Sequence, residues 1–434
     1  MAGQGARAIP RTPVAPAVPP VPVASVAPAG LVAATGPRRL SMRGVRVAVL
    51  NFREPLQSVA GGAEEYAWQV SRHLAGQGAE VTFVTAREAG QAAAEERDGI
   101  ALRRMGNPFL VYLLVPLWML LRRRRFDVVI DCMNGIPFFA PLVVSRRTVV
   151  VSLVHHVHDR QFYAFFPPWL ARIGCFIEGP VARLVYRRRP TVTVSESSRA
   201  ELRERLGWLA PIQVIPNGSP VARPVADPGG VAGDPAVVYL GRLVGHKRVE
   251  RVVDLARDLG DAWPGMHVHV IGRGHEQERL AAHASGRGVE DRVHLHGFLP
   301  EAAKNAILGA ARLNVTASAF EGWGLTVIEA AALGVPTVAY DVAGLRDSVR
   351  DGVTGWLVRD GETLAGVVDR ALGELSDPAR REEIQQACRL WAAEFTWGRT
   401  GATMTGLITT ELAKNGRHLH ASDLCLASGE TDPP

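Results

Sequence analysis

Short, nearly continuous runs of β-branched residues, each followed by a helical stretch, recur along this sequence. Val45 to Asn51 and Thr148 to Val154 are two such runs in the first half, and Ala236 to Leu240 and Met266 to Ile271 are two in the second. Such runs are typical of strands buried on both faces of a parallel sheet. Strands that alternate with helices favour doubly wound α/β sheets, which bind ligands at the carboxyl ends of their strands. The sequence therefore predicts two α/β domains.

The predicted domain boundaries follow from this alternation and from a Pro/Gly-rich stretch after Gly218. We expect an N-terminal Rossmann-like domain over residues 42–218 and a second one over residues 219–395. A last helix over residues 396–415 is expected to cross back to the first domain.

Both ends of the chain are expected to be disordered tails, over residues 1–41 and 416–434. The first tail is rich in Pro, Ala and Val, and its proline density prevents a stable helix or a central strand. Met42 stands directly before the first strand, so translation from Met1 and translation from Met42 both remain open.

Composition excludes several classes of protein. Hydrophobic residues make up 47% of the 434 residues and charged residues 21%, which is typical of a globular protein. The formal charge of +6 is modest for this length, and no zinc-finger spacing or RNA-binding aromatic signature accompanies it, so no nucleic-acid partner is expected. The four cysteines are scattered, as in reduced cytosolic proteins. No apolar run reaches transmembrane length, and we expect a cytoplasmic protein.

The stretch from Ser318 to Ala332 (SAFEGWGLTVIEAAA) places two glutamates eight positions apart. Glu321 lies in a glycine-rich loop, and Glu329 lies in a run of good helix formers, so the stretch is predicted to be a loop followed by a helix N-terminus. Helix N-termini offer unpaired N–H groups to phosphates. Glu329 has apolar neighbours, and its carboxylate is costly there unless a partner compensates it.

The predicted strand ends of the second half carry further polar or glycine clusters. Arg242 and Lys247 follow the first strand, Gly272 and Gly274 the second, and Phe298 the third. Parallel strands bring such loops to one crevice. Arg242 and Lys247 could be a solvated pair, but four clusters at strand ends favour a site that holds a diphosphate and its leaving charge.

In the first half, Gly61 and Gly62 lie at a predicted strand-to-helix turn, and a cluster of histidines follows the Thr148–Val154 strand. If the strand continued, only one of His155 and His156 could face a cleft, and we favour His155. Two alternatives are a zinc site that includes His158 and polar loop histidines bonded to the backbone.

These motifs together resemble those of the family 4 retaining glycosyltransferases, which have the GT-B fold. The resemblance covers residues 43 to 400 and depends mainly on Gly241-Arg242 with Lys247 and on Glu321-Gly322-Trp323-Gly324-Leu325 through Glu329. The other matching segments are Gly61-Gly62-Ala63-Glu64, His155, Thr193-Val194-Ser195, Ile215-Pro216-Asn217-Gly218 and Asp351-Gly352-Val353-Thr354-Gly355. The resemblance implies two Rossmann-like domains facing a central cleft. It also implies transfer of a hexose from a nucleotide diphosphate sugar to a hydroxyl, with retention of anomeric configuration.

The resemblance also implies roles in donor binding. Arg242 and Lys247 would bind the donor diphosphate, together with the backbone N–H groups of Gly324, Leu325 and Thr326. This would be the most strongly charged part of the site.

Further roles concern the rest of the donor. Glu329 would bind the ribose hydroxyls, and Glu321 would contact the donor sugar near the reacting face. Phe298 would lie by the base. Gly61 and Gly62 would let a phosphate or the acceptor approach the first domain.

His155 would face the sugar from the first domain. The candidate catalytic residues are therefore His155, Glu321, Arg242 and Lys247. Such enzymes need no metal, the sequence has no D-x-D motif, and no cofactor is expected.

Two other functions remain open. A nucleotide-sugar epimerase of the same fold would not require Arg242, Lys247, Glu321 and Glu329 together. A non-catalytic nucleotide-sugar-binding protein would keep the second-domain site without requiring His155. Release of free nucleotide diphosphate on adding an acceptor separates these functions.

Residues 109–125 combine thirteen apolar residues, Pro116 among them, with the arginines Arg122 to Arg125. This segment is too short to span a bilayer. Either it is a helix buried in the first domain, or part of it reaches the surface and contacts anionic lipid at the inner face of the membrane. The second alternative would suit a lipid-linked acceptor.

Overall fold

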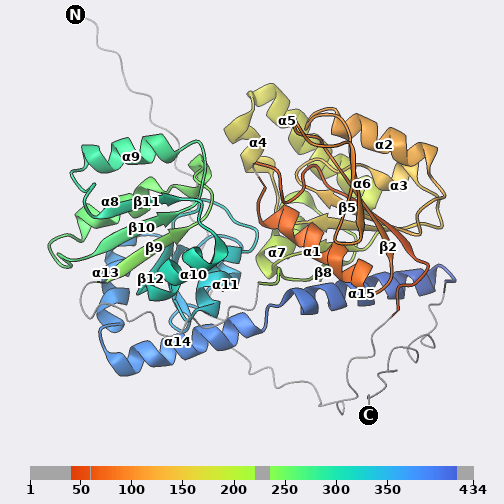
Figure 1. Ribbon diagram of the computed structural model, residues 1–434. Coiled ribbons are helices and arrows are strands. Elements are labelled where there is room, and N and C mark those ends of the chain that lie inside the picture. Colours follow the sequence, from red (N-terminus) through yellow and green to blue (C-terminus); the bar gives the residue numbers. More distant parts are fainter. Residues whose placement is uncertain (1–40, 59, 220–234, 418–434) are drawn as a thin grey trace, which may run out of the picture. The chain divides into compact units, whose positions relative to one another are not determined.

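The computed structural model describes residues 41–58, 60–219 and 235–417 (Figure 1). It contains two mainly parallel sheets with helices on both faces, as the alternation predicts. The predicted tails lie outside the described residues except for Ser41, Gly416 and Arg417. The chain passes from one sheet to the other between residues 214 and 236, and the predicted domain boundaries remain predictions.

The first sheet has the strand order β3-β4-β2-β1-β5-β6-β7-β8, and every neighbouring pair is parallel except β3 with β4. Its inner strands are fully buried runs such as VVIDCM and VVVSLV, which explains why they were predictable. Its strands are β1 (Arg46–Leu50), β2 (Glu80–Thr85), β3 (Ala94–Arg97), β4 (Ile100–Arg104), β5 (Val128–Met133), β6 (Val149–Val154), β7 (Thr191–Thr193) and β8 (Ile212–Val214).

Helices cover both faces of the first sheet. One face packs against α1 (Gly62–Gly76) and the last helix, α15 (Trp397–Lys414), which lie side by side in Figure 1. Thr400 of α15 donates a 2.8 Å hydrogen bond to the Pro216 carbonyl. The opposite side carries α2 (Val111–Leu121), α3 (Ala140–Val143), α6 (Ala182–Tyr186) and α7 (Glu196–Leu206). Before α6 in the chain come α4 (Asp159–Phe165), α5 (Pro168–Phe176) and a π-helical turn, η1 (Ile177–Val181).

The second sheet is wholly parallel, with the order β11-β10-β9-β12-β13-β14. Its strands are β9 (Ala236–Leu240), β10 (His267–Ile271), β11 (Val293–Gly297), β12 (Leu313–Thr316), β13 (Thr337–Tyr340) and β14 (Gly355–Val358). Its helices are the 3-10 turn η2 (Gly245–Lys247), α8 (Glu250–Asp258), α9 (Gln277–Gly286), α10 (Glu301–Ala310), α11 (Leu325–Ala332), α12 (Leu345–Ser348), α13 (Leu364–Glu374) and α14 (Pro378–Ala393).

Helix α2 is apolar on two opposite faces. Val111, Val115 and Met119 are fully buried against the first sheet, whereas Leu113 and Leu117 are 67% and 52% exposed. The interpretation of this segment as a wholly buried helix is therefore wrong, and one face reaches the surface. Within the described ranges, no helix is long and apolar enough to cross a membrane.

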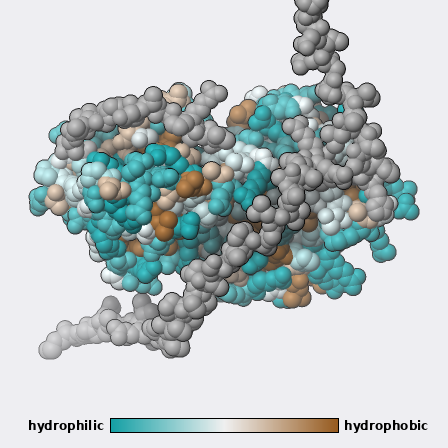
Figure 2. Space-filling view, turned by 90° about the horizontal axis from the view of Figure 1, so that it is seen from below, coloured by the Kyte–Doolittle hydropathy of each residue, from teal (hydrophilic) through white to brown (hydrophobic). Residues whose placement is uncertain are grey.

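Figure 2 shows one face of the molecule that is largely hydrophilic, with apolar residues in small separate groups wherever grey atoms do not cover it. The exposed leucines of α2 differ from this pattern because they follow one another along one helix face. An exposed apolar stripe of this kind needs its own explanation.

Candidate active site

A cavity of about 440 Å³ lies between the carboxyl ends of strands in the two sheets. This volume falls within the usual range for small-molecule sites. The first half contributes the loop after β1, the start of α1 and the segment after β6. The second half contributes the η2 segment and the loop before α11. The strand-end residues predicted in the first half and those predicted in the second half therefore meet in one cavity.

The N-termini of α1 and α11 both line this cavity, through Gly62 to Glu64 and through Gly324 and Leu325. Glu64 accepts a 2.8 Å hydrogen bond from the Gly61 N–H and so caps α1. Helix N-termini carry partial positive charge and free N–H groups, so two of them in one cavity favour an anion there.

Gly61 allows the Arg242 side chain to approach the α1 turn closely. A β-carbon at Gly61 would lie 3.3 Å from Cζ of Arg242, so a larger residue would crowd the guanidinium. Arg242 and Arg53 both line the cavity. The positive charge of these two arginines adds to the positive ends of the helices.

The loop before α11 contacts the first half directly at Gly322. A β-carbon at this position would lie 2.6 Å from the carbonyl oxygen of His155, a distance that backbone atoms cannot accommodate. The Ser198 hydroxyl donates a 3.0 Å hydrogen bond to the same carbonyl. Glycine at 322 therefore allows the two walls of the cavity to touch.

Lys247 and Glu321 form an ion pair at this loop. Burial acts to raise the pKa of Glu321, but the charge and hydrogen bond of Lys247 outweigh it and lower the pKa below its usual value. Glu321 is therefore ionised at neutral pH although its side chain is only 23% exposed.

Glu329, on α11, is paired with Lys304 of α10 at 2.9 Å. Burial raises the pKa of Glu329, and Lys304 opposes this rise without cancelling it. The sequence indicated that this carboxylate needs a partner but did not identify Lys304, because the two residues lie on different helices.

The histidine cluster enters the cavity from the end of β6. Only one of His155 and His156 was expected to face the cleft if the strand continued, but the strand ends at Val154, and both residues line the cavity with His158. Burial lowers the pKa of His155 to about 3 and that of His158 to about 4. His156 stacks on His158 with 4.0 Å between ring centroids and hydrogen-bonds Gln161.

Four buried polar atoms of the cavity residues have no hydrogen-bond partner among the described residues. They are His155 Nε2, Asn217 Oδ1, His246 Nδ1 and Trp323 Nε1. Unsatisfied buried polar atoms are uncommon and costly in folded proteins. Four of the ten such atoms among the described residues belong to residues that line this cavity.

Comparison with known proteins identifies the family. The description "Glycosyltransferase Family 4" matches residues 60–223, and "Glycosyl transferases group 1" matches residues 227–391. The chain belongs to glycosyltransferase family 4. It is 26% identical to an alpha-D-kanosaminyltransferase of Streptomyces kanamyceticus over 314 residues, which are 67% of this chain and 80% of that protein.

Solved structures support the GT-B fold of this glycosyltransferase. Sucrose-phosphate synthase from Thermosynechococcus elongatus superposes with a TM-score of 0.74 and 20% identity, covering 85% of this chain and all of that one. The HepE protein of Anabaena in complex with UDP-glucose has a TM-score of 0.64 and 18% identity, covering 84% and 99% of the two chains. The predicted family and fold class are confirmed.

Most of the predicted site residues of this glycosyltransferase lie in or next to the first cavity. Gly62, His155, Arg242, Glu321, Gly324 and Leu325 line the cavity. Gly61 borders the Arg242 side chain. Lys247 does not line the cavity but pairs with Glu321, which does. Thr326, Glu329 and Phe298 do not line it. Phe298 is 63% exposed and lies under the Arg273 guanidinium, 4.6 Å from it.

Other cavity residues of this glycosyltransferase were not proposed from the sequence. His246 stacks on Phe320 at 4.8 Å between ring centroids, and burial lowers its pKa to about 4. Arg53 enters from the loop after β1 and Gln161 from α4, two segments whose function the sequence did not indicate. Among the described residues, no three His, Cys, Asp or Glu side chains are grouped so that they could hold a metal ion.

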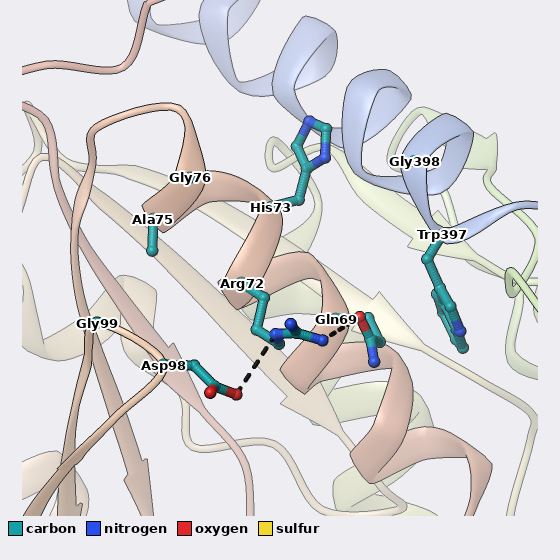
Figure 3. Close-up of a pocket in the computed structure, with 9 residues that line it drawn as sticks. All are labelled: Gln69, Arg72, His73, Ala75, Gly76, Asp98, Gly99, Trp397 and Gly398. Atoms are coloured by element: carbon teal, nitrogen blue, oxygen red, sulfur yellow. Dashed lines mark hydrogen bonds and ion pairs between the residues drawn. The ribbon is translucent and has the colours of Figure 1, made fainter. Parts of the chain in front are cut away.

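A second cavity of about 570 Å³ lies between α1, the turn before β4 and the start of α15 (Figure 3). Arg72 closes one side of it by pairing with Asp98 at 3.4 Å. It contains none of the predicted site residues, and the N-termini of α1 and α11 do not line it. We therefore place the chemistry of the glycosyltransferase in the first cavity.

Proposed function

We propose that this glycosyltransferase moves a hexose from a nucleotide diphosphate sugar to a hydroxyl acceptor, with retention of anomeric configuration. One observation carries the proposal. Two helix N-termini and Arg242 meet in a cavity where four buried polar atoms lack partners. The positive groups suit a diphosphate, and the neutral polar atoms suit sugar hydroxyls.

The proposed diphosphate site is built from Arg242, Lys247 and the backbone N–H groups of Gly324, Leu325 and Thr326. Lys247 is already paired with Glu321, but an ammonium group has three donors and can bind a phosphate oxygen as well. These groups would stabilise the charge that develops on the diphosphate as it leaves. Gly61 and Gly62 would allow the phosphates to approach α1.

The proposed ribose ligand is Glu329. Its Oε2 accepts the hydrogen bond from Lys304, and a carboxylate has further lone pairs that can accept ribose hydroxyls. Lys304 would hold the carboxylate in place before the donor arrives. Phe298 is the proposed neighbour of the base.

The proposed catalytic residues beside the sugar are Glu321 and His155. Glu321 is kept ionised by Lys247, so its negative charge would stabilise positive charge that develops at the anomeric carbon. His155 is neutral because of its burial, and its unpartnered Nε2 would hydrogen-bond a sugar hydroxyl.

The comparisons support this proposal without deciding the donor. A structural neighbour is described in complex with UDP-glucose, and a relative is named for transferring kanosamine. The epimerase and the non-catalytic binding protein are the alternatives. The acceptor is proposed to be a hydroxyl compound, and a lipid-linked one would require the protein to work at a membrane surface.

The first test is a thermal-shift screen against nucleotide diphosphate sugars. A ligand at one hundred times its dissociation constant adds about 2.7 kcal/mol of stability. The donor found in this way is then incubated with hydroxyl acceptors, and the released nucleotide diphosphate and the anomeric configuration of the product are measured. We expect an α-configured product from an α-configured donor. An epimerised donor formed without acceptor would favour the epimerase, and a β-configured product would refute retention.

A further inference from the structure

Large apolar side chains are exposed mainly in the first-sheet half of the molecule. Of the nineteen that are exposed among the described residues, sixteen precede β9 and three follow it. Most of the sixteen lie on or beside the helices α2 to α6, including Leu117, Leu142, Trp169, Phe176 and Leu184. We call the outer side of these helices, residues 109–188, the outer helical layer. It lies across the first sheet from α15 in Figure 1.

Helix α2 contributes the longest apolar stripe of the outer helical layer. Leu113, Leu117, Leu120 and Leu121 follow one another at helical spacing and are 45–75% exposed. Their opposite neighbours are buried in the core. A surface helix normally has a polar outer face, so the stability of the fold does not explain these leucines.

The charge of the same region is strongly one-sided. Residues 109–188 contain eleven arginines and four acidic residues, whereas residues 236–417 contain twenty-one basic and twenty-three acidic residues. The four acidic residues of the outer helical layer are either buried or paired with arginines. Asp131 and Glu178 are fully buried, Asp127 pairs with Arg46 and Arg417, and Asp159 pairs with Arg205.

The arginines border the apolar stripe. Arg122 to Arg125 directly follow α2, and Arg123, Arg124 and Arg125 are exposed. Arg122 lies over the ring of Trp118 at 4.6 Å. Tyr112 and Trp118 pack inward against Phe138 and Phe126. Leucines therefore form the apolar part of this surface, and arginines form its rim.

We propose that the outer helical layer docks on an anionic phospholipid bilayer. Exposed leucines and aromatic side chains enter the headgroup region of a bilayer, while arginines bind anionic headgroups. A nucleic acid would use the arginines but not the leucines. A second copy of this chain would bring like charges together.

The docking surface reaches the candidate active site. Phe165 lines the cavity and is also 63% exposed, and Tyr163, Phe166 and Trp169 near it in sequence are exposed too. A bilayer on this surface would therefore lie close to the mouth of the cavity. This would let the proposed transfer use an acceptor held in the membrane.

The test is sedimentation of the full chain with vesicles of phosphatidylcholine alone and of phosphatidylcholine with phosphatidylglycerol, at low and high salt. Donor and acceptor are absent, so failure here is distinct from failure of the proposed transfer. We expect binding to the anionic vesicles only, weakened by salt. Binding to neither vesicle would overturn the proposal.

Two sets of substitutions separate the arginines from the leucines. Arg122 to Arg125 all changed to Gln should reduce partition by about six-hundredfold, because each of the four basic residues near an anionic surface strengthens partition about fivefold. Leu113, Leu117 and Leu120 changed to Gln should reduce it at least tenfold. The matched control changes the exposed arginines Arg251, Arg257, Arg279 and Arg287 of the second half to Gln and should bind like the wild type.

Other outcomes would also decide the matter. Equal sedimentation of the Arg122–Arg125 variant and the wild type would refute the proposal, as would an equal loss in the control variant. Concentration-dependent dimerisation that is lost in the leucine variant, without vesicle binding, would assign the surface to a second copy. Melting temperatures of all variants show whether a loss of binding reflects unfolding.

Discussion

His155 and His158 on one wall of the cavity, and Glu321 with its partner Lys247 on the other side, occupy similarly enclosed surroundings but differ in charge. Burial lowers the pKa of the two histidines to about 3 and about 4, so both are neutral at pH 7. Lys247 instead keeps the pKa of Glu321 below its usual value. A partner of opposite charge therefore decides whether a group in this cavity remains charged.

The carboxylates behind the two walls, Glu178 and Glu329, both have pKa values raised by burial but differ in their partners. Glu178, behind the histidines, accepts a 2.7 Å hydrogen bond from the His158 backbone N–H, yet burial raises its pKa to about 8. Glu329 has the ammonium group of Lys304 at 2.9 Å. The first-sheet wall is thus suited to neutral hydroxyls, and the second-sheet wall to the charged part of a donor.

The largest expected effect is on the charged wall. We predict that Arg242→Ala and Lys247→Ala each reduce turnover by roughly a hundredfold or more, because preorganised charges at a leaving group contribute about this much. The double variant should lose more. Release of nucleotide diphosphate measures the effect, and Lys414→Ala, exposed on α15, is the control. Full activity of the double variant would remove these residues from the site.

On the neutral wall, His155→Ala is expected to reduce turnover by roughly a hundredfold while donor binding stays the same, since a hydrogen bond to the sugar serves the transfer step more than ground-state affinity. Turnover and the donor-induced thermal shift are measured on the same samples. His156→Ala is the informative comparison, because both side chains line the cavity. If His156→Ala loses transfer and His155→Ala does not, the role belongs to His156.

Elements with a strong local pattern could be predicted from the sequence. The bounds of β9 match the predicted strand, and those of β1, β6, β10 and α15 agree with the predicted ranges to within one residue at each end, because buried strands and a long helix have clear apolar patterns. The hairpin of β3 and β4 was missed, since its first strand is AEER. Glu54, which is distant from the hairpin in sequence, holds it in place by pairing with Arg97 and, at 2.6 Å, with Arg104.

The candidate site was predictable as a set of strand-end residues but not as a set of contacts. Lys247 pairs with Glu321 across 74 positions, and Lys304 with Glu329 across 25. No local pattern encodes such pairs, because they depend on how the strands are arranged in the sheet. For the same reason, the sequence did not show that the apolar helix α2 has one face in the core and one at the surface.

A smaller effect on stability is expected when the pH is lowered, and its size should differ between the two walls of the cavity. The pKa values of His155, His156 and His158 are lowered by burial, so below about pH 6.5 the unfolded chain binds protons that the folded chain does not. Glu178, whose pKa is raised to about 8, acts in the opposite sense between about pH 4.5 and 8. Because three histidines oppose one glutamate, stability should fall as the pH drops from 6.5 toward 4.5.

The expected loss is about 1.4 kcal/mol per pH unit for each uncompensated proton. Urea midpoints at pH 6.5 and 5 measure it, and His156→Gln should make the dependence shallower, whereas the exposed His275→Gln should not. On the other wall, burial also lowers the pKa of His246 to about 4, so acid destabilises this wall too, but through one histidine instead of three. Hydrogen exchange at pH 5 should therefore increase more around β6 than around η2. An equal loss of protection on both walls would contradict this contrast.

The smallest expected effect concerns the exposed leucines of the two halves. Leu117 on α2 is 52% exposed and Leu390 on α14 is 65% exposed. Changing either to Gln, a helix former nearly as good as Leu, should change the free energy of unfolding by no more than about 0.5 kcal/mol. Met119 lies two positions beyond Leu117 and is fully buried. Changing it to Ala should lower the free energy of unfolding by about 2–5 kcal/mol. Urea denaturation of the three variants gives these values. A loss of 2 kcal/mol or more in Leu117→Gln alone would mean that this leucine belongs to the core, and the outer face of α2 would then need no membrane to explain it.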